Sequence, residues 1–521
     1  MARSRASATT AALVLCGFTM LLPIRSTLAA PSCAASCVGR MAACRAERCP
    51  AATGKDRSHC RDVCRAVTGC AAGAARIRTL ATVVTECRSG PEGFTARQRL
   101  EIRRGDCAPI VVAEARGDVP VPDTGLCAIF GEFRVGLTSV SGGVFERLSV
   151  SPDGRTVFFE MTDKFQQLPV PRLSFPEPGL YVVGADGSGM RRLGPPSQEA
   201  PFRLVGSPRP PGFSIIIFNL PSFSPDSRLV LYSDRGPGSD GSDAVQMMAL
   251  DTRTGRRTQL TRFVAGSQTT ATQLRGFFVD AHTVVGYSRE PTTPEGIGEL
   301  SAFTVQDDGT DFQSLEVPVL VPGSHVLSNF AIAGARGTVF VAAFEDEATE
   351  PFIGPRQELV IQKNARVLQL TSFGRADTGA GVLSGTGGRI FFTASADPFG
   401  LNASHTCQVF SIDQLGGDLR QVTRWQSPIP VTGGCFFSES PACNTAVSNS
   451  QIIDPVTDTL IVDSSCDPFG IGFNGSQIYA MRANGSGLRQ LTSYRGMVTE
   501  PDGAVSVELP GPWDYSGLKN H

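Results

Sequence analysis

A repeated unit runs through most of this chain, and no other feature restricts the possible folds as strongly. Each copy reads Ser-Pro-Asp-Gly or a close variant, an apolar strand, a loop, a second strand, a Gly-rich turn and a strand ending on Leu-Thr. Four short strands per copy would make one blade of a β-propeller. The closing apolar residues lie 52 to 69 positions apart, at Leu193, Leu260, Leu315, Leu370, Val422 and Leu491. The sequence therefore predicts an all-β, six-bladed propeller over residues 145–510.

The turns of the unit have a local physical basis. In residues 151–154 (Ser-Pro-Asp-Gly), Pro presets φ, Asp caps the turn and Gly accepts the positive φ that closes a hairpin. Residues 483–487 (Ala-Asn-Gly-Ser-Gly) do the same before a final strand. No single blade can bury its apolar faces alone, so the blades must form a closed ring.

The two ends of the repeat region leave room for a seventh blade. Residues 500–508 (Glu-Pro-Asp-Gly-Ala-Val-Ser-Val-Glu) resemble the opening hairpin of another unit. Strands before Phe145, around 128–130 and 134–137, could complete it and so remove exposed strand edges. Six and seven blades stay as alternatives, and residues 511–521 are expected to form a tail.

The unit that begins at residue 151 and recurs up to residues 489–492 (Arg-Gln-Leu-Thr) resembles the WD-like repeat of the TolB family. The resemblance covers residues 145–492. It implies a TolB-like β-propeller, as in the periplasmic member of the bacterial Tol–Pal system, and the same repeat also forms the non-catalytic domain of some serine peptidases. The amino-terminal α/β domain of the family is not evident, since a cysteine-rich module stands in its place.

That module covers residues 31–95 and is expected to be a small helical hairpin held by disulfides. Its Ala- and Arg-rich background favours helix, and Cys33, Cys37 and Cys44 would share one helix face. A zinc site is the alternative, but structural zinc sites have tighter cysteine pairs. Residues 96–144 read as a β-rich connection into the propeller.

Residues 1–30 read as a signal peptide. Arg3 and Arg5 precede an apolar stretch over 11–23, and small residues lie before Pro31. An uncleaved anchor is the alternative, but the apolar run is shorter than the roughly 18 residues that span a membrane. We expect a periplasmic or secreted protein with no transmembrane span after cleavage.

Cysteine usage agrees with export. Cleavage would remove Cys16 and leave two even groups, as disulfide pairing requires. The expected disulfide cysteines are Cys33, Cys37, Cys44, Cys49, Cys60, Cys64, Cys70, Cys87, Cys107, Cys127, Cys407, Cys435, Cys443 and Cys466. Cys107 and Cys127 could form a local pair. In the last group we favour Cys435 with Cys443 and Cys407 with Cys466, with crossed pairing as the alternative.

Most of the extra length of the repeats falls in second-to-third strand loops and in blade-to-blade connections, which share one face of the disc. These segments are 161–178, 194–220, 233–244, 289–299, 345–357, 424–449 and two Asp-Pro-Phe-Gly loops. Because long loops on a rigid scaffold carry function, this face is the predicted binding face. The candidate binding residues are Asp397, Phe399, Asp467, Phe469, Glu345, Asp346 and Glu347. Acidic residues Asp234, Asp240 and Asp243 could bind calcium, although solvated loop charge explains them as well.

Catalysis has little support. No Gly-x-Ser-x-Gly motif occurs, and His282, His325 and His405 are the only histidines between residues 145 and 492. A net charge of −2 offers no basic surface for nucleic acid. We expect no cofactor and no metal. The sequence favours a non-enzymatic exported propeller that binds a protein or cell-envelope component; the alternative is a propeller lyase or hydrolase acting on an extracellular polymer.

Overall fold

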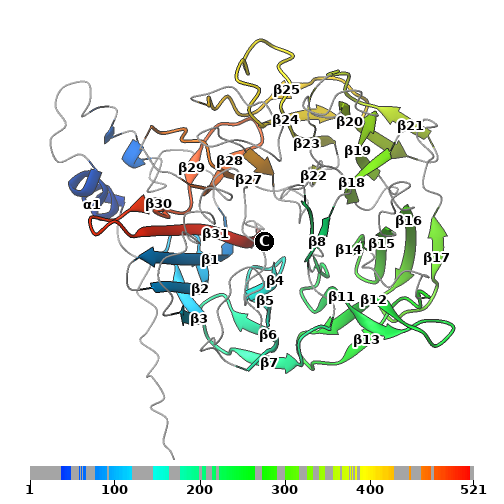
Figure 1. The fold of residues 1–521 in the computed structure, drawn as a ribbon. Helices are drawn as coiled ribbons and strands as arrows, with labels where there is room; N and C mark the ends of the chain where they lie inside the picture. Colours follow the sequence, from blue (N-terminus) through cyan, green and yellow to red (C-terminus); the bar gives the residue numbers. More distant parts are fainter. Residues whose placement is uncertain are drawn as a thin grey trace, which may run out of the picture.

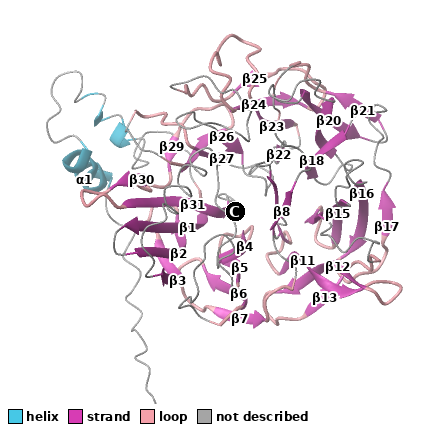
Figure 2. Ribbon diagram, in the orientation of Figure 1, coloured by secondary structure: helices cyan, strands magenta, loops and turns pink. Residues whose placement is uncertain are grey.

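The fold is an all-β propeller with very little helix among the residues that the structure describes (Figures 1 and 2). The computed structural model of the chain describes residues 37–48, 58, 60, 61, 63–65, 77–90, 93–119, 145–162, 177–198, 202–206, 214–218, 222–264, 273–289, 300–315, 325–332, 340–346, 356–363, 366–374, 376, 378, 382, 383, 388–427, 445–447, 459–470 and 475–516.

Six antiparallel four-stranded sheets follow one another along the chain and form the blades, which confirms the predicted propeller. The first is β4 (Phe145–Val150), β5 (Thr156–Met161), β6 (Gly179–Gly184) and β7 (Arg191–Gly194). The second is β10 (Ser222–Phe223), β11 (Leu229–Pro237), β12 (Asp243–Asp251) and β13 (Arg257–Gln259). The third is β14 (Gln273–Phe278), β15 (Thr283–Arg289), β16 (Leu300–Gln306) and β17 (Gln313–Leu315).

The remaining three blades have the same order of strands. The fourth is β18 (His325–Ile332), β19 (Phe340–Asp346), β20 (Arg356–Lys363) and β21 (Arg366–Gln369). The fifth is β22 (Val382–Leu383), β23 (Arg389–Ala394), β24 (Gln408–Asp413) and β25 (Arg420–Gln421). The sixth is β26 (Thr445–Val447), β27 (Thr459–Ser464), β28 (Gln477–Arg482) and β29 (Arg489–Gln490). A separate two-stranded sheet, β8 (Phe202–Gly206) with β9 (Ser214–Phe218), lies between the first and second blades in the sequence.

A five-stranded sheet from both ends of the chain joins the sixth blade to the first. Its order is β3 (Ile110–Val119), β2 (Gly93–Arg104), β1 (Thr79–Gly90), β31 (Val505–Ser516) and β30 (Gly496–Thr499). Leu80 and Ile77 pack with residues of the sixth blade, and Val83 packs with Phe159 of the first. Closure by strands from both ends is therefore confirmed, although the amino-terminal partner is 79–119; residues 128–137 lie outside the described residues.

Two predicted boundaries are wrong. The helical module was expected to extend to residue 95, but residues 79–90 form β1. The stretch Thr-Leu-Ala-Thr-Val-Val-Thr is rich in β-branched residues. It pairs along its whole length with β2, and with β31 apart from a register shift between Thr82 and Val84. The tail was expected to begin at residue 511, but β31 continues to Ser516 because it pairs with β1 as far as Thr79.

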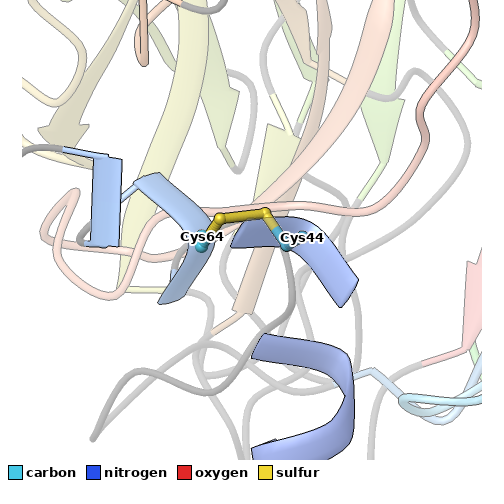
Figure 3. Close-up of a disulfide and its surroundings, with 2 residues drawn as sticks. All are labelled: Cys44 and Cys64. Carbon is cyan, nitrogen blue, oxygen red and sulfur yellow. A yellow bond between two sulfur atoms is a disulfide. The ribbon is translucent and has the colours of Figure 1, made fainter. Parts of the chain in front are cut away.

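The front module is helical where the structure describes it. Helix α1 (Cys37–Arg48) and helical residues between 58 and 65 are joined by a disulfide between Cys44 and Cys64 (Figure 3). Further disulfide-bonded cysteines are Cys60, Cys87, Cys107, Cys407 and Cys466. Their connectivity stays a prediction. The other predicted cysteines are Cys37, whose side chain is not described, and Cys33, Cys49, Cys70, Cys127, Cys435 and Cys443, which lie outside the described residues.

The core lies between neighbouring blades. In β5, Val157 and Phe159 face the five-stranded sheet, whereas Phe158 packs with Tyr232 of the second blade. This alternation is the period-two pattern of a strand buried on both faces. Each blade therefore depends on its neighbours for burial, as the repeat requires.

A hydrogen-bond set explains why blades end on an apolar residue followed by Thr. In the fifth blade, the Thr423 hydroxyl donates to Gln408 Oε1 at 2.8 Å, and Val409 N donates to the Thr423 hydroxyl at 2.8 Å. Trp425 N donates to the same Gln408 oxygen at 3.0 Å, and Gln408 Nε2 donates to Trp425 O at 2.6 Å. The same arrangement recurs in two other blades, at Gln246 with Thr261 and Phe263 and at Gln477 with Thr492 and Tyr494. The closing Thr thus fixes the outer strand and the first residues of the next connection.

Candidate functional site

Two loops of identical sequence stand on neighbouring blades. Residues 397–400 and 467–470 both read Asp-Pro-Phe-Gly. The first loop joins β23 to β24 and the second joins β27 to β28, so each is a second-to-third strand connection, as predicted. Because both blades have the same order of strands, the two loops lie at the same face of the disc.

The first loop is held in shape by its own side chains. Asp397 Oδ1 accepts hydrogen bonds from the backbone N–H groups of Leu401 at 2.6 Å and Asn402 at 2.7 Å. Asn402 is fully buried, and its Nδ2 donates to the carbonyls of Ser395, Ala396 and Thr406 at 3.3, 3.1 and 2.8 Å. These bonds order the loop before any partner arrives, so less conformational entropy is lost on binding.

The tip of this loop presents apolar side chains to solvent. Phe399 is 45% exposed and Leu401 is 38% exposed. Gly400 adopts φ +65°, the left-handed conformation that closes the turn. The exposed residues 398–401 carry no charge, and the neighbouring Asp397 carboxylate is hydrogen-bonded to backbone N–H groups. An ordered loop with an exposed aromatic is typical of an interface anchor.

The second loop is tied to the sixth blade. Asp467 Oδ1 accepts from Phe469 N at 3.3 Å, and Phe469 is half-buried against the ring of Tyr479, with centroids 6.2 Å apart. The Tyr479 hydroxyl donates to Cys466 O at 3.2 Å. Burial raises the pKa of Tyr479 well above its usual value, so this phenol stays a neutral donor. Cys407 and Cys466, both buried and disulfide-bonded, lie at the ends of the two loops, where we predicted disulfides.

Trp425 and Gln426 connect the two loops. The Trp425 ring lies 5.2 Å from the Tyr479 ring, and Gln426 Nε2 donates to Leu401 O at 3.4 Å. Four residues of this site were not predicted from the sequence: Leu401, Trp425, Gln426 and Tyr479. A signal for Trp425 was present, because an aromatic follows the closing Thr by two positions in four blades: Phe263, Phe373, Trp425 and Tyr494.

Two of the predicted acidic binding residues lie in a strand. Glu345 and Asp346 were expected in a loop, but they belong to β19, which pairs as far as Asp346 with Arg356 of β20. Glu347 lies outside the described residues.

The other acidic cluster is used within the fold. Asp234 was also expected in a loop, but it is a buried residue of β11 that accepts from Gln198 N at 2.8 Å and pairs with Arg257 at 3.4 Å. Asp240 caps the turn at Ser242, and Asp243 in β12 pairs with Arg235 at 3.0 Å. The loop 233–244 shrinks to a short turn because β11 and β12 extend toward each other.

The three histidines that the structure describes belong to three different blades. His282 Nδ1 lies 3.3 Å from Asp307 in a surface turn, His405 Nδ1 lies 3.1 Å from Ser395 O, and His325 belongs to β18. No group of three or more metal-ligating side chains gathers among the residues that the structure describes. Within the same ranges, no helix has the length and apolar character to cross a membrane.

Solved propeller structures resemble the chain in fold alone. The β-propeller domain of the Trilobed protease from Pyrococcus furiosus is 9% identical with a TM-score of 0.39, and the match covers 79% of this chain and 96% of that one. An oligogalacturonate lyase from Vibrio parahaemolyticus is 10% identical with a TM-score of 0.39, covering 78% and 98%. An acylaminoacyl peptidase from Pyrococcus horikoshii is 10% identical with a TM-score of 0.42, covering 81% of this chain and 53% of the peptidase. No protein-family model and no curated protein matches the sequence, so the TolB-like resemblance stays a prediction.

Proposed function

We propose that this chain is a non-enzymatic, exported propeller that binds a protein or cell-envelope component through the face carrying the two Asp-Pro-Phe-Gly loops. The observation that carries the proposal is the exposure of Phe399 and Leu401 on a loop that Asp397 and Asn402 hold rigid. Leaving two large apolar side chains in water has a free-energy cost that a partner can recover by covering them.

The chemistry of the loop restricts the partner. Residues 398–401 carry no charge, and the nearest carboxylate is already hydrogen-bonded to backbone. A partner therefore offers an apolar group to Phe399 and Leu401, and the affinity depends weakly on salt.

Capture from a cell-envelope extract tests the proposal. The full mature chain is immobilised as wild type, as the double variant Phe399→Ala/Leu401→Ala, and as Leu415→Ala. Leu415 is a matched control, since it is 85% exposed but lies in a third-to-fourth strand turn on the opposite face.

The double variant is expected to lose a component that wild type and Leu415→Ala both retain, with unchanged thermal stability. Equal retention by all three proteins would contradict the proposal. So would degradation of an envelope polymer by the wild-type protein with nothing retained.

A further inference from the structure

The two Asp-Pro-Phe-Gly loops are physically continuous across the joint between the fifth and sixth blades. Gln426 contacts the first loop through Leu401 O, and Trp425 contacts Tyr479, which supports Phe469 of the second loop. These contacts join four segments: 397–402, 425–426, 467–469 and β28.

We propose that the two loops form one binding surface for an extended protein segment with apolar side chains at two separated positions, and that Trp425 is the positioning residue that sets the spacing of the loops. The inference rests on the proposed function and specifies its partner. One apolar contact would fall on Phe399 and Leu401, and the other on the exposed part of Phe469.

The class of partner follows from the occurrence of the same loop sequence on two successive blades and from the uncharged tips of both loops. Each loop offers a Pro-Phe-Gly tip, and the carboxylates of Asp397 and Asp467 both accept hydrogen bonds from their own loop backbone. Residues 398–401 and 468–470 therefore offer no positive charge to a phosphate or a sugar acid. Two uncharged aromatic contacts on successive blades fit an extended chain crossing from one blade to the next, because such a chain presents side chains at regular intervals.

The positioning role follows from how Trp425 is held. Its backbone N–H and carbonyl are both fixed by Gln408, at 3.0 and 2.6 Å. Its ring packs in the cluster that contains Tyr479 and Phe469, which belong to the next blade. Replacing the ring by a methyl group removes the support of the second loop while the clamp on the backbone stays, so the two tips lose their fixed separation.

The experiment uses the full mature chain to select from phage-displayed random peptides of about twelve residues, which span roughly 40 Å when extended. The selected peptides are then titrated against Phe399→Ala, Phe469→Ala, Trp425→Ala, Trp425→Phe and Leu415→Ala. Folding of each variant is checked by thermal unfolding. The chain has two tryptophans, so Trp513→Phe leaves Trp425 as the sole tryptophan reporter of the site.

Selected peptides are expected to carry two apolar groups and to bind about tenfold or more weakly to Phe399→Ala, Phe469→Ala and Trp425→Ala. Trp425→Phe should rescue binding, Leu415→Ala should bind as wild type does, and peptide should shift the Trp425 emission. Loss in Phe399→Ala but not in Phe469→Ala or Trp425→Ala would overturn this inference and leave the proposed function standing. Failure to select any peptide would overturn the inference as well. Peptide binding that is unchanged in Phe399→Ala would overturn the inference and also count against the proposed function.

Discussion

Glu358 Oε2 accepts a hydrogen bond from the Thr371 hydroxyl at 2.5 Å, at the place where other blades pair a glutamine with the closing threonine. Glu358 Oε1 accepts from Gly374 N at 3.0 Å, and Leu359 N donates to the Thr371 hydroxyl at 2.8 Å. The fourth blade thus keeps the two hydrogen bonds of the closing threonine that the second, fifth and sixth blades have, with a carboxylate in place of an amide. A carboxylate has no N–H to replace the amide donor of those blades, and Gly374 N takes the place of the aromatic N–H.

Replacing Thr371 by Val is expected to lower the free energy of unfolding by about 1–3 kcal/mol, because it leaves Glu358 and Leu359 N with buried, unpaired groups. Urea unfolding of the full chain measures the loss. Thr371→Ser keeps the hydroxyl and is the matched control. Equal stability of the two variants would show that the hydroxyl contributes no more than the methyl group at this position.

The sequence predicted the blades because their signals are local. The Pro-Asp-Gly turns and alternating apolar residues act within a few positions, so the blades and the Asp-Pro-Phe-Gly loops at Asp397 and Asp467 were placed correctly. The role of Trp425 was not predictable in this way, since its ring packs on Tyr479 of the next blade, more than fifty positions away. Likewise β1 was assigned to the helical module, because its pairing with β31 joins opposite ends of the chain.

The loop position expected for Asp234 was wrong for a related physical reason. Charged residues such as Asp234 were expected to be solvated in loops, whereas Asp234 is buried with Arg257 as its ion-pair partner. A buried charge needs a counter-charge or hydrogen-bond donors, and these come from segments distant in sequence. Composition within one loop therefore cannot separate a binding carboxylate from a structural one.

Asp463 is expected to make stability fall as pH rises. It is 3% exposed, accepts one hydrogen bond from Trp513 Nε1 at 3.2 Å, and burial raises the pKa of its carboxyl well above the usual value. The pKa of Asp463 is therefore higher in the folded than in the unfolded protein. Its contribution to stability is fully present below the unfolded pKa, about 4, and is lost as pH rises through the folded pKa.

Asp463→Asn removes this titration, so the variant should gain stability over wild type as pH rises from about 5 to about 9. Urea unfolding across that range measures the difference. Asp418→Asn is the control: hydrogen bonds from Arg420 and Arg389 lower the pKa of that exposed carboxyl, so its difference from wild type should be flat over the same range. A flat difference for Asp463→Asn would refute the prediction.

Glu160→Gln is expected to destabilise the protein strongly. Glu160 Oε2 lies 2.5 Å from Arg147 Nε, and both side chains are almost fully buried. Removing one member of a buried ion pair costs about 3–5 kcal/mol, because the other charge stays in a low-dielectric environment. The double variant Arg147→Met/Glu160→Leu should recover much of this loss, since it removes both charges.

A surface pair supplies the comparison for the Arg147–Glu160 pair. Arg88 and Asp502 form an ion pair with both side chains about half exposed, so Arg88→Gln should cost no more than about 1 kcal/mol. Chemical denaturation of the four proteins gives the three free-energy differences. A Glu160→Gln loss as small as that of Arg88→Gln would mean that Arg147 finds another partner when Glu160 is neutral.

The turn at Gly309 in the third blade lies so close to the second blade that it leaves no room for a side chain. It has φ +86°, and an added Cβ would lie 2.8 Å from the carbonyl oxygen of Gln259, the last residue of β13. Gly503 has φ +82° with nothing within 4 Å of an added Cβ, so it provides a control with the same backbone strain and no contact.

Gly503→Ala should lower the free energy of unfolding by about 1–2 kcal/mol because of the left-handed conformation alone. Gly309→Ala should lose more, because either the turn or β13 must also move. Urea unfolding of both variants measures the two losses of stability. Equal losses would mean that the two blades accommodate the added methyl group with no further loss of stability.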